Sequence, residues 1–186
     1  MADAATLEAI ASELGRDREV LRLPDGSLQT VDDMGFVLGF QRTVRRPIRT
    51  ATEGVNGPGS GPGRPLNDVA VNEDAPAQPL TLSHVVYFVP DEAKAAAFYT
   101  ERLGFRETDR LLGAGGFLRP AGTQDHHTLF MIQTPPFMKG VEHFTFHMAG
   151  PTAMMQAGYR FVGKGYESFW GPVSYTHLRA HETGRN

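Results

Sequence analysis

The chain has 186 residues, of which 40% are hydrophobic and 21% charged, and its formal net charge is −3 at pH 7. This balance, with no run of Lys or Arg, argues against a broad nucleic-acid-binding surface. The absence of cysteine excludes disulfides and thiolate metal sites, so a transition metal would have to be bound by His, Asp or Glu. With no apolar run long enough to span a membrane and no signal-peptide pattern, the sequence predicts a cytoplasmic protein with neither nucleic-acid nor membrane partners.

Residues 1–45 carry the pattern of a helix followed by short strands. Four apolar residues recur at helical spacing: Leu7, Ile10, Ala11 and Leu14. They predict a helix over residues 4–14, with Gly15 as its stop. The stretch from 19 to 40 predicts short strands separated by turns at 24–26 and 32–35.

Between residues 46 and 80 the periodic pattern stops. The stretch GVNGPGSGPGRP, residues 54–65, consists mostly of glycine and proline. Such a composition cannot hold a helix or a central strand. We therefore expect residues 46–80 to form a linker between domains or a long surface loop.

Regular patterns return at Thr81. LSHVVYFVP, residues 82–90, predicts a strand, and Asp91 caps a helix that Gly104 ends. The apolar residues of this helix are expected to pack in the core rather than to contact a substrate: Phe98, Tyr99 and Leu103. Three more strand patterns follow, FRETDRLL, GGFLRP and HTLFMIQ, which complete one β-α-β-β-β unit over residues 81–136.

The same order of patterns restarts after Pro135-Pro136. VEHFTFHMAG, residues 141–150, predicts a strand, and Pro151 opens a helix that Gly158 is expected to close. YRFVGKGYE, residues 159–167, then predicts a further strand. The chain therefore contains the beginning of a second copy of the unit.

Both opening strands carry a histidine at their third position, His84 in LSHVVYFVPD and His143 in VEHFTFHMAG. Side chains alternate between the two faces of a strand, so His143 shares its face with Thr145 and His147. If the two units pack with pseudo-twofold symmetry, both imidazoles reach one cavity. There they could bind a divalent metal, and a carboxylate would complete a facial triad. The alternative is that each histidine is an ordinary half-buried residue.

The segment HVVYFVPD followed by AAAFYTERLGF resembles the vicinal-oxygen-chelate superfamily, which includes glyoxalases, bleomycin resistance proteins and dioxygenases and is built from β-α-β-β-β modules. The sequence is most similar to the type I extradiol catechol dioxygenases. DHHTLFMIQ resembles their acid-base histidine segment, GVEHFTFHMAG resembles the strand of their second iron ligand, and GRPLN lies where they join two domains. The resemblance covers about residues 20–172. It implies an α+β fold in which paired modules form an incomplete barrel, the second module (137–172) being truncated.

By this resemblance, His84 and His143 are the histidine ligands of Fe(II), although Mn(II) suits the same ligands. His127 or its neighbour His126 would be the catalytic acid-base. If that segment is extended, the two side chains point to opposite faces and only one faces the cavity; the alternative is a solvated pair in a loop. His147 would lie in the pocket wall or behind the ligands, with a role in the core equally open.

The chain departs from the family pattern at both ends. Residues 1–45 resemble only the closing part of a preceding module, with Asp33-Met34-Gly35 where the family more often has Asp-Pro-Gly. After Pro172 the family continues with strands that include the glutamate ligand. This chain instead has VSYTHLRAHETGRN, which resembles a translated sequencing-library adapter.

Residues 173–186 are therefore expected to be non-native. In that case the HxxxH spacing of His177 and His181, and the nearby Glu182, carry no function. Glu167 lies too early to match the family's glutamate, so the third metal ligand is expected to be absent. We also expect the truncated second module to leave a sheet edge and an apolar face uncovered and the fragment to be unstable.

The implied function is that of a fragment of a non-haem Fe(II) extradiol ring-cleavage dioxygenase acting on a catechol-type diol and O2, with the truncated chain itself inactive. The intact protein is expected to be a homo-oligomer. Two alternatives remain: a glyoxalase-like or epimerase-like metal-dependent isomerase, and a metal-free module of the same fold that binds a small molecule.

Overall fold

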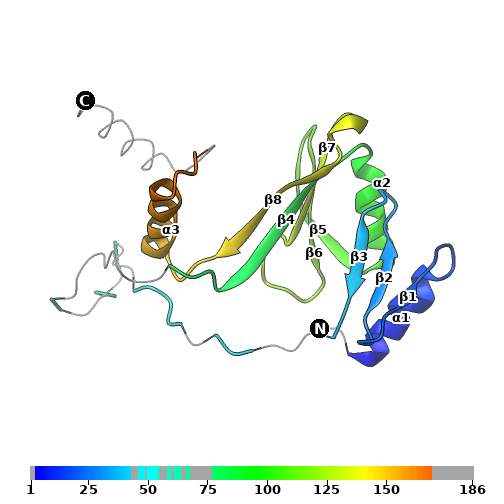
Figure 1. The fold of residues 1–186 in the computed structure, drawn as a ribbon, viewed down its shortest axis with the longest axis horizontal. Coiled ribbons are helices and arrows are strands. Elements are labelled where there is room, and N and C mark those ends of the chain that lie inside the picture. The colour runs from blue at the N-terminus through cyan, green and yellow to red at the C-terminus, as the bar shows by residue number, and fades with distance from the viewer. Residues whose placement is uncertain are drawn as a thin grey trace. The chain divides into compact units, whose positions relative to one another are not determined.

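The computed structural model describes residues 3–42, 46–48, 50–54, 58–59, 61–63, 66–67 and 77–168. Half of the Gly/Pro-rich stretch 54–65 and the whole predicted tail, with His177, His181 and Glu182, thus lie outside the described residues. The chain divides into two compact units, one formed by residues 1–49 and 81–147 and the other by 50–80 and 148–186. Each unit is described by itself (Figure 1).

The first segment of the first unit contains a helix and a small antiparallel sheet. Helix α1 (Ala4–Leu14) begins at Asp3, whose side chain accepts a hydrogen bond from the backbone N–H of Thr6, as expected of an N-cap aspartate. Strands β1 (Leu21–Arg22), β2 (Leu28–Val31) and β3 (Val37–Phe40) follow and pair in that order. The predicted helix and strands are confirmed here.

The second segment forms a mixed sheet. Its elements are β4 (Thr81–Val89), α2 (Glu92–Ala97), the π-helical turn η1 (Phe98–Arg102), β5 (Phe105–Leu111), β6 (Gly115–Pro120), β7 (Leu129–Gln133), the short 3-10 helix η2 (Pro136–Met138) and β8 (Gly140–His147). Within the described residues the strand order is β5-β6-β7-β4-β8. Strands β4 and β7 are parallel, whereas β4 and β8 are antiparallel. The β-α-β-β-β order predicted for 81–136 and the α+β class are confirmed; the pairing of modules stays a prediction.

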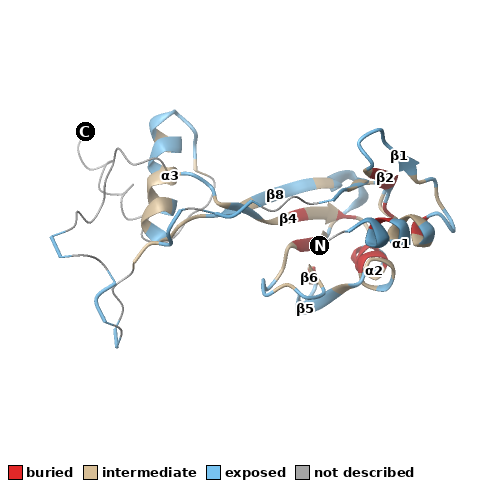
Figure 2. Cartoon of the chain, turned by 90° about the horizontal axis from the view of Figure 1, so that it is seen from below, coloured by how far each residue is buried: buried red, intermediate tan, exposed pale blue. Residues whose placement is uncertain are grey.

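The core of the first unit lies between the helices and the larger sheet, and Figure 2 shows buried residues on α2 and β4. The buried apolar cluster contains Leu14, Val89, Ala95, Ala96, Phe98, Tyr99, Leu118, Leu129 and Met131. The helix residues Phe98 and Tyr99 therefore pack as expected. Because Leu14 of α1 belongs to the same cluster, the N-terminal segment is part of this core.

Helix α3 (Pro151–Gly163) belongs to the second unit and corrects two predictions. The helix passes through Gly158, so the expected end at that residue and the strand expected over 159–167 are wrong. Its stop is Gly165, which has φ +84° and donates its N–H to the carbonyl of Val162. A glycine inside a helix costs only about 1 kcal/mol, whereas a glycine at positive φ ends one.

The N-terminus of α3 carries an acidic cap from the expected linker, just before its Gly/Pro-rich stretch. The carboxylate of Glu53 accepts hydrogen bonds from the backbone N–H, at 2.8 Å, and from the hydroxyl of Thr152. The Glu53 backbone N–H also donates to the carbonyl of Ala149. A negative charge at this end of a helix is favourable, so this contact ties part of the expected linker to α3.

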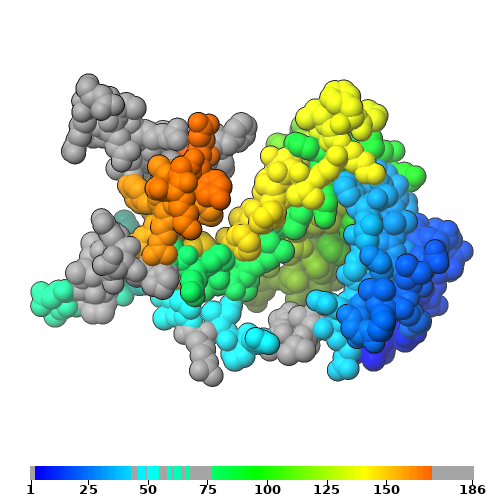
Figure 3. Space-filling model, viewed as in Figure 1, coloured from blue at the N-terminus to red at the C-terminus, as the bar shows by residue number. Residues whose placement is uncertain are grey.

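Strand β8 stands at one edge of the larger sheet in the part of the chain that the structure describes, and its side chains lie at the surface (Figure 3). Large apolar residues are exposed there: Val141, Phe144 and Phe146. None of the helices that the structure describes is long and apolar enough to cross a membrane.

Candidate metal centre

The histidines of the two opening strands lie next to each other. Strand β4 pairs directly with β8, in a register that places Val86 opposite His143 and His84 opposite Thr145. Nε2 of His84 is 3.2 Å from Nε2 of His143, and the ring centroids are 5.3 Å apart. The sequence predicted that the repeat would bring these two rings together; direct strand pairing does so.

Two hydroxyl groups on the same pair of strands complete the polar face. The hydroxyl of Thr145 lies 3.0 Å from Nε2 of His84. A register shift between Leu82 and His84 places Thr81 opposite His147, and the Thr81 hydroxyl lies 2.8 Å from His147 Nδ1. His147 therefore shares the face of the other histidines but is held at the end of the strand pair.

His127 is the third imidazole of the cluster. Its ring centroid lies 4.4 Å from that of His84. His126 lies one step further away, with its Nδ1 3.0 Å from Nδ1 of His127 and its Nε2 3.6 Å from a carboxylate oxygen of Asp109. The chain bends at residues 125–126, so the condition for opposite faces, an extended segment, is not met. His127, and not His126, contacts His84.

Two phenylalanines lie beside these histidines. The Phe117 ring stacks on Phe130 with centroids 4.1 Å apart and lies 4.9 Å from His127 and 5.4 Å from His126. Strands β6 and β7 place Phe117 and Phe130 directly opposite each other. The site thus has a planar apolar wall next to its imidazoles. The sequence analysis did not single out Phe117; its alternation with buried Leu118 in GGFLRP was the available signal.

The surroundings favour neutral imidazoles. Burial lowers the pKa of His84, and the nearby His143 and His147 lower it further. Burial also lowers the pKa of His127, with smaller effects from His84 and His126. A neutral imidazole is the form that binds a metal or accepts a proton. Both roles therefore suit His84 and His127.

The spacing of the two Nε2 atoms fits one cation. Metal–imidazole bonds are about 2.1 Å, so two such nitrogens on adjacent positions of one ion stand roughly 3 Å apart. The observed separation is 3.2 Å. Among the described residues there is no group of three His, Asp or Glu side chains that could hold a metal. The two histidines fit adjacent ligand positions, and the third ligand stays a prediction.

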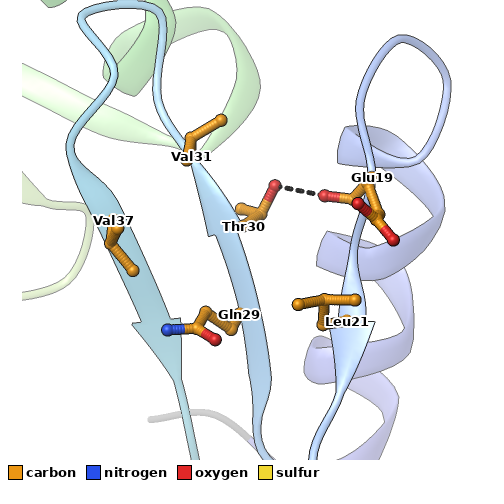
Figure 4. Close-up of a pocket in the computed structure, with 6 residues that line it drawn as sticks. All are labelled: Glu19, Leu21, Gln29, Thr30, Val31 and Val37. Carbon is orange, nitrogen blue, oxygen red and sulfur yellow. Dashed lines mark hydrogen bonds between the residues drawn. The ribbon is translucent and has the colours of Figure 1, made fainter.

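A separate hollow of about 280 Å³ lies on the small sheet, lined by Glu19, Leu21, Gln29, Thr30, Val31 and Val37. Figure 4 shows the hydroxyl of Thr30 bonded to the backbone carbonyl of Glu19, at 2.7 Å. Leu21, Val31 and Val37 make most of its wall aliphatic. The hollow has no histidine in its lining and is not a candidate for the chemistry of the cluster.

The fold is shared with solved structures of a glyoxalase and a dioxygenase. The Mn(II)-bound glyoxalase from Novosphingobium aromaticivorans matches with a TM-score of 0.62 and 19% identity over 91% of this chain and 51% of its own. The 2,3-dioxygenase LapB from Pseudomonas sp. KL28 matches with a TM-score of 0.67 and 19% identity over 93% and 60%. These identities show a shared fold only.

The sequence match identifies a family for the second half of the chain. Residues 81–169 match the Glyoxalase/Bleomycin resistance protein/Dioxygenase superfamily. Metapyrocatechase 2 from Cupriavidus necator is 30% identical over 93 residues, which are 50% of this chain and 28% of that protein. The chain is thus similar to an extradiol dioxygenase, and it spans well under two thirds of the relatives that it matches.

Proposed function

We propose that this chain is part of an extradiol ring-cleavage dioxygenase that opens a catechol-type aromatic diol with O2. The observation that carries the proposal is the cluster of His84, His143 and His127, in which two Nε2 atoms lie 3.2 Å apart and the third ring contacts the first. The sequence similarity to Metapyrocatechase 2 supports the same reaction.

In this proposal, His84 and His143 hold the metal, for which Fe(II) is the first choice and Mn(II) the second. Bound Fe(II) would supply open positions that both diol oxygens can occupy and a path for electrons from the ring to O2. By family resemblance, the third ligand is a glutamate on a later strand. Strand β4 pairs with β7 on the side away from β8, whereas the described residues place no strand on the far side of β8. That free edge is where a strand of the second module would pair.

The chain's own residues would handle the substrate and its proton. His127, kept neutral by burial, would accept a proton from a diol hydroxyl and return it later in the reaction. The stacked rings of Phe117 and Phe130 would face the aromatic ring of the diol and exclude water from one side of it. His126 is more exposed than His127, and its ring contacts are with His127 and Phe117, so this proposal gives it no such role.

The rival functions are a metal-dependent isomerase and a metal-free binding module. The isomerase would use the same two histidines, and the fold alone fits it, as the Mn(II)-bound glyoxalase illustrates. The 30% identity to a metapyrocatechase favours the dioxygenase. The facing Nε2 atoms favour both enzymes over a module that needs no metal.

The test uses the complete native reading frame, reconstituted with Fe(II) without oxygen and then mixed with catechol and O2. We expect oxygen uptake to match the appearance of a yellow ring-opened product. Metal-dependent isomerisation of a hemithioacetal without oxygen uptake would support the isomerase instead. Tight binding of a small molecule by protein that takes up no Fe(II) or Mn(II) would support the binding module.

A further inference from the structure

We propose that Glu142 and Ser83 are positioning residues. Each keeps the proton of the following histidine on Nδ1, so that both Nε2 atoms present their lone pairs to one cation. The inference rests on the proposed function for the identity of that cation only. The placement of the two protons is a property of the protein without metal.

Each of the two histidines is contacted at Nδ1 by the residue just before it. A carboxylate oxygen of Glu142 contacts Nδ1 of His143. The hydroxyl of Ser83 lies 3.3 Å from Nδ1 of His84. Ser83 and Glu142 hold the second position in LSHVV and VEHFT, so the repeat supplies a partner for Nδ1 in both strands. The contacts place a hydrogen-bond partner at Nδ1 of both rings, while the two Nε2 atoms face each other.

The chemistry of Glu142 decides which nitrogen of His143 carries the proton. A neutral imidazole has one N–H donor and one acceptor nitrogen, and an ionised carboxylate only accepts. The nitrogen that faces Glu142 must therefore be the donor, which leaves the lone pair on Nε2. Metal-binding histidines commonly donate their other N–H to a carboxylate or carbonyl in this way, which fixes the ring and raises its basicity.

Ser83 constrains His84 less, because a hydroxyl both donates and accepts. The Thr145 hydroxyl lies 3.0 Å from Nε2 of His84 and can donate to that nitrogen when Nδ1 carries the proton. With Nδ1 protonated in both rings, two lone pairs face each other at 3.2 Å. Two facing lone pairs repel, and a cation bound by both would remove that repulsion.

Glu142 is available for this role. The carboxylate side chain is 31% exposed and that of His143 is 47% exposed. In the described part of the chain, the carboxylate of Glu142 contacts the His143 ring and forms no ion pair with a Lys or Arg. Strand β8 is an edge strand there, which leaves the Glu142 side chain free to reach its neighbour.

The test reads the proton positions directly in the 186-residue chain without metal. Two-bond ¹H–¹⁵N correlation spectra, recorded at about pH 8 where most histidines are neutral, distinguish the Nδ1–H from the Nε2–H form of each ring. We expect Nδ1–H for His143 and His84 in the wild type. Glu142→Ala should give a mixture at His143 only, and Ser83→Ala a smaller change at His84.

Glu142→Gln separates charge from hydrogen bonding, because the amide both donates and accepts and should allow both forms. The matched control Glu101→Gln removes one negative charge from the exposed face of η1 and should leave both rings unchanged. An Nε2–H form of His143 in the wild type would overturn the proposal. So would an unchanged Nδ1–H form in a folded Glu142→Ala variant, and should that variant not fold, the wild-type and Glu142→Gln spectra decide.

A titration with Co(II), an oxygen-stable probe, separates this inference from the proposed function. If the wild type binds Co(II), Glu142→Ala should weaken binding roughly 10- to 100-fold, as expected for a residue that orients a metal ligand. Glu142→Gln should be intermediate, and Glu101→Gln should stay within about threefold, as expected for a surface charge. If Co(II) does not bind at the histidines while the tautomers are as expected, the metal function fails and the positioning stands.

Discussion

The hydroxyl of Tyr99 donates a 3.0 Å hydrogen bond to the carboxylate of Asp32, joining the turn between β2 and β3 to the helix that follows β4. The other oxygen of Asp32 accepts from the backbone N–H groups of Met34 and Phe36. Burial raises the pKa of Tyr99, and the charge of Asp32 raises it further, so the phenol keeps its proton. One buried carboxylate thereby orders a turn and ties two distant segments together.

Tyr99→Phe removes this donor and leaves one oxygen of Asp32 without it. We expect a loss of about 1–3 kcal/mol in the free energy of unfolding, because a buried polar group without its partner has a cost of that size. Urea denaturation followed by circular dichroism measures the change. Tyr166→Phe, at an exposed tyrosine, is the control and should have little effect. Equal stabilities of Tyr99→Phe and the wild type would show that the link contributes nothing.

The ion pairs that Arg102 forms with Glu13 and Asp17 should stabilise the fold less in acid. Hydrogen bonds from Arg16 and then Arg102 lower the pKa of Glu13, and those from Arg18 and then Arg102 lower the pKa of Asp17. A carboxylate whose pKa is lower in the folded state stabilises the fold above its unfolded pKa, and that contribution is lost as the pH falls. This stabilisation is therefore lost as the pH falls below the ordinary pKa values of the two groups, 4.5 for Glu13 and 3.8 for Asp17.

Arg102→Gln removes the guanidinium that the two acids share. We expect the variant to be less stable than the wild type at neutral pH and to lose less stability on acidification. Melting temperatures between about pH 2 and 7, the range in which carboxylates titrate, measure both effects. The difference should shrink in high salt, because Asp17 is exposed, Glu13 and Arg102 are partly exposed, and salt screens their charges. Parallel pH profiles for the two proteins would contradict the prediction.

Metal binding should depend on His84 and His143 and not on His147. Replacing either ligand by alanine should weaken Co(II) or Mn(II) binding by at least the roughly 100-fold seen when groups behind a ligand are lost. His147→Ala is the matched control, since His147 lies on the same face of β8 but is bonded to Thr81. Isothermal titration gives the three affinities. A loss in His147→Ala as large as in His143→Ala would place the ion elsewhere.

Turnover measurements should distinguish the catalytic roles of His126 and His127. In the complete reading frame, His127→Gln should lower kcat by about 10²- to 10⁴-fold, the usual contribution of a positioned acid or base. Its metal content should be unchanged. His126→Gln should have a much smaller effect, because the His126 ring contacts His127 and Phe117 and not His84. The reverse order of the two variants would assign the acid-base role to His126.

Much of the fold follows from local pattern, because caps, turns and alternation act over a few residues. Asp91 caps α2 through Lys94, and Gly104, at φ +70°, follows the helical segment, both as the sequence indicated. Gly158 misled because a glycine can also adopt helical backbone angles inside a helix. Sequence does not show φ; Gly165, at φ +84°, follows the end of α3, whereas Gly158 lies inside it.

Only the part of the candidate site that lies in the repeated strands could be predicted from the sequence. His84 and His143 stand out because they occupy the same place in two similar strands. The choice between His126 and His127 depended on a bend at residues 125–126 that alternation along a strand does not predict. Phe117 and the Tyr99–Asp32 link arise from contacts between segments distant in sequence, and no local pattern encodes such partners.

The register of the antiparallel pair β4 and β8 fixes how the imidazole rings of His84 and His143 face each other. Val86 lies opposite His143, so an offset of a single residue would turn that ring to the other side of the sheet. An ion bound by both rings, as proposed, would favour this alignment of β4 and β8 over a shifted one. Metal binding would then stabilise the native register of the two strands.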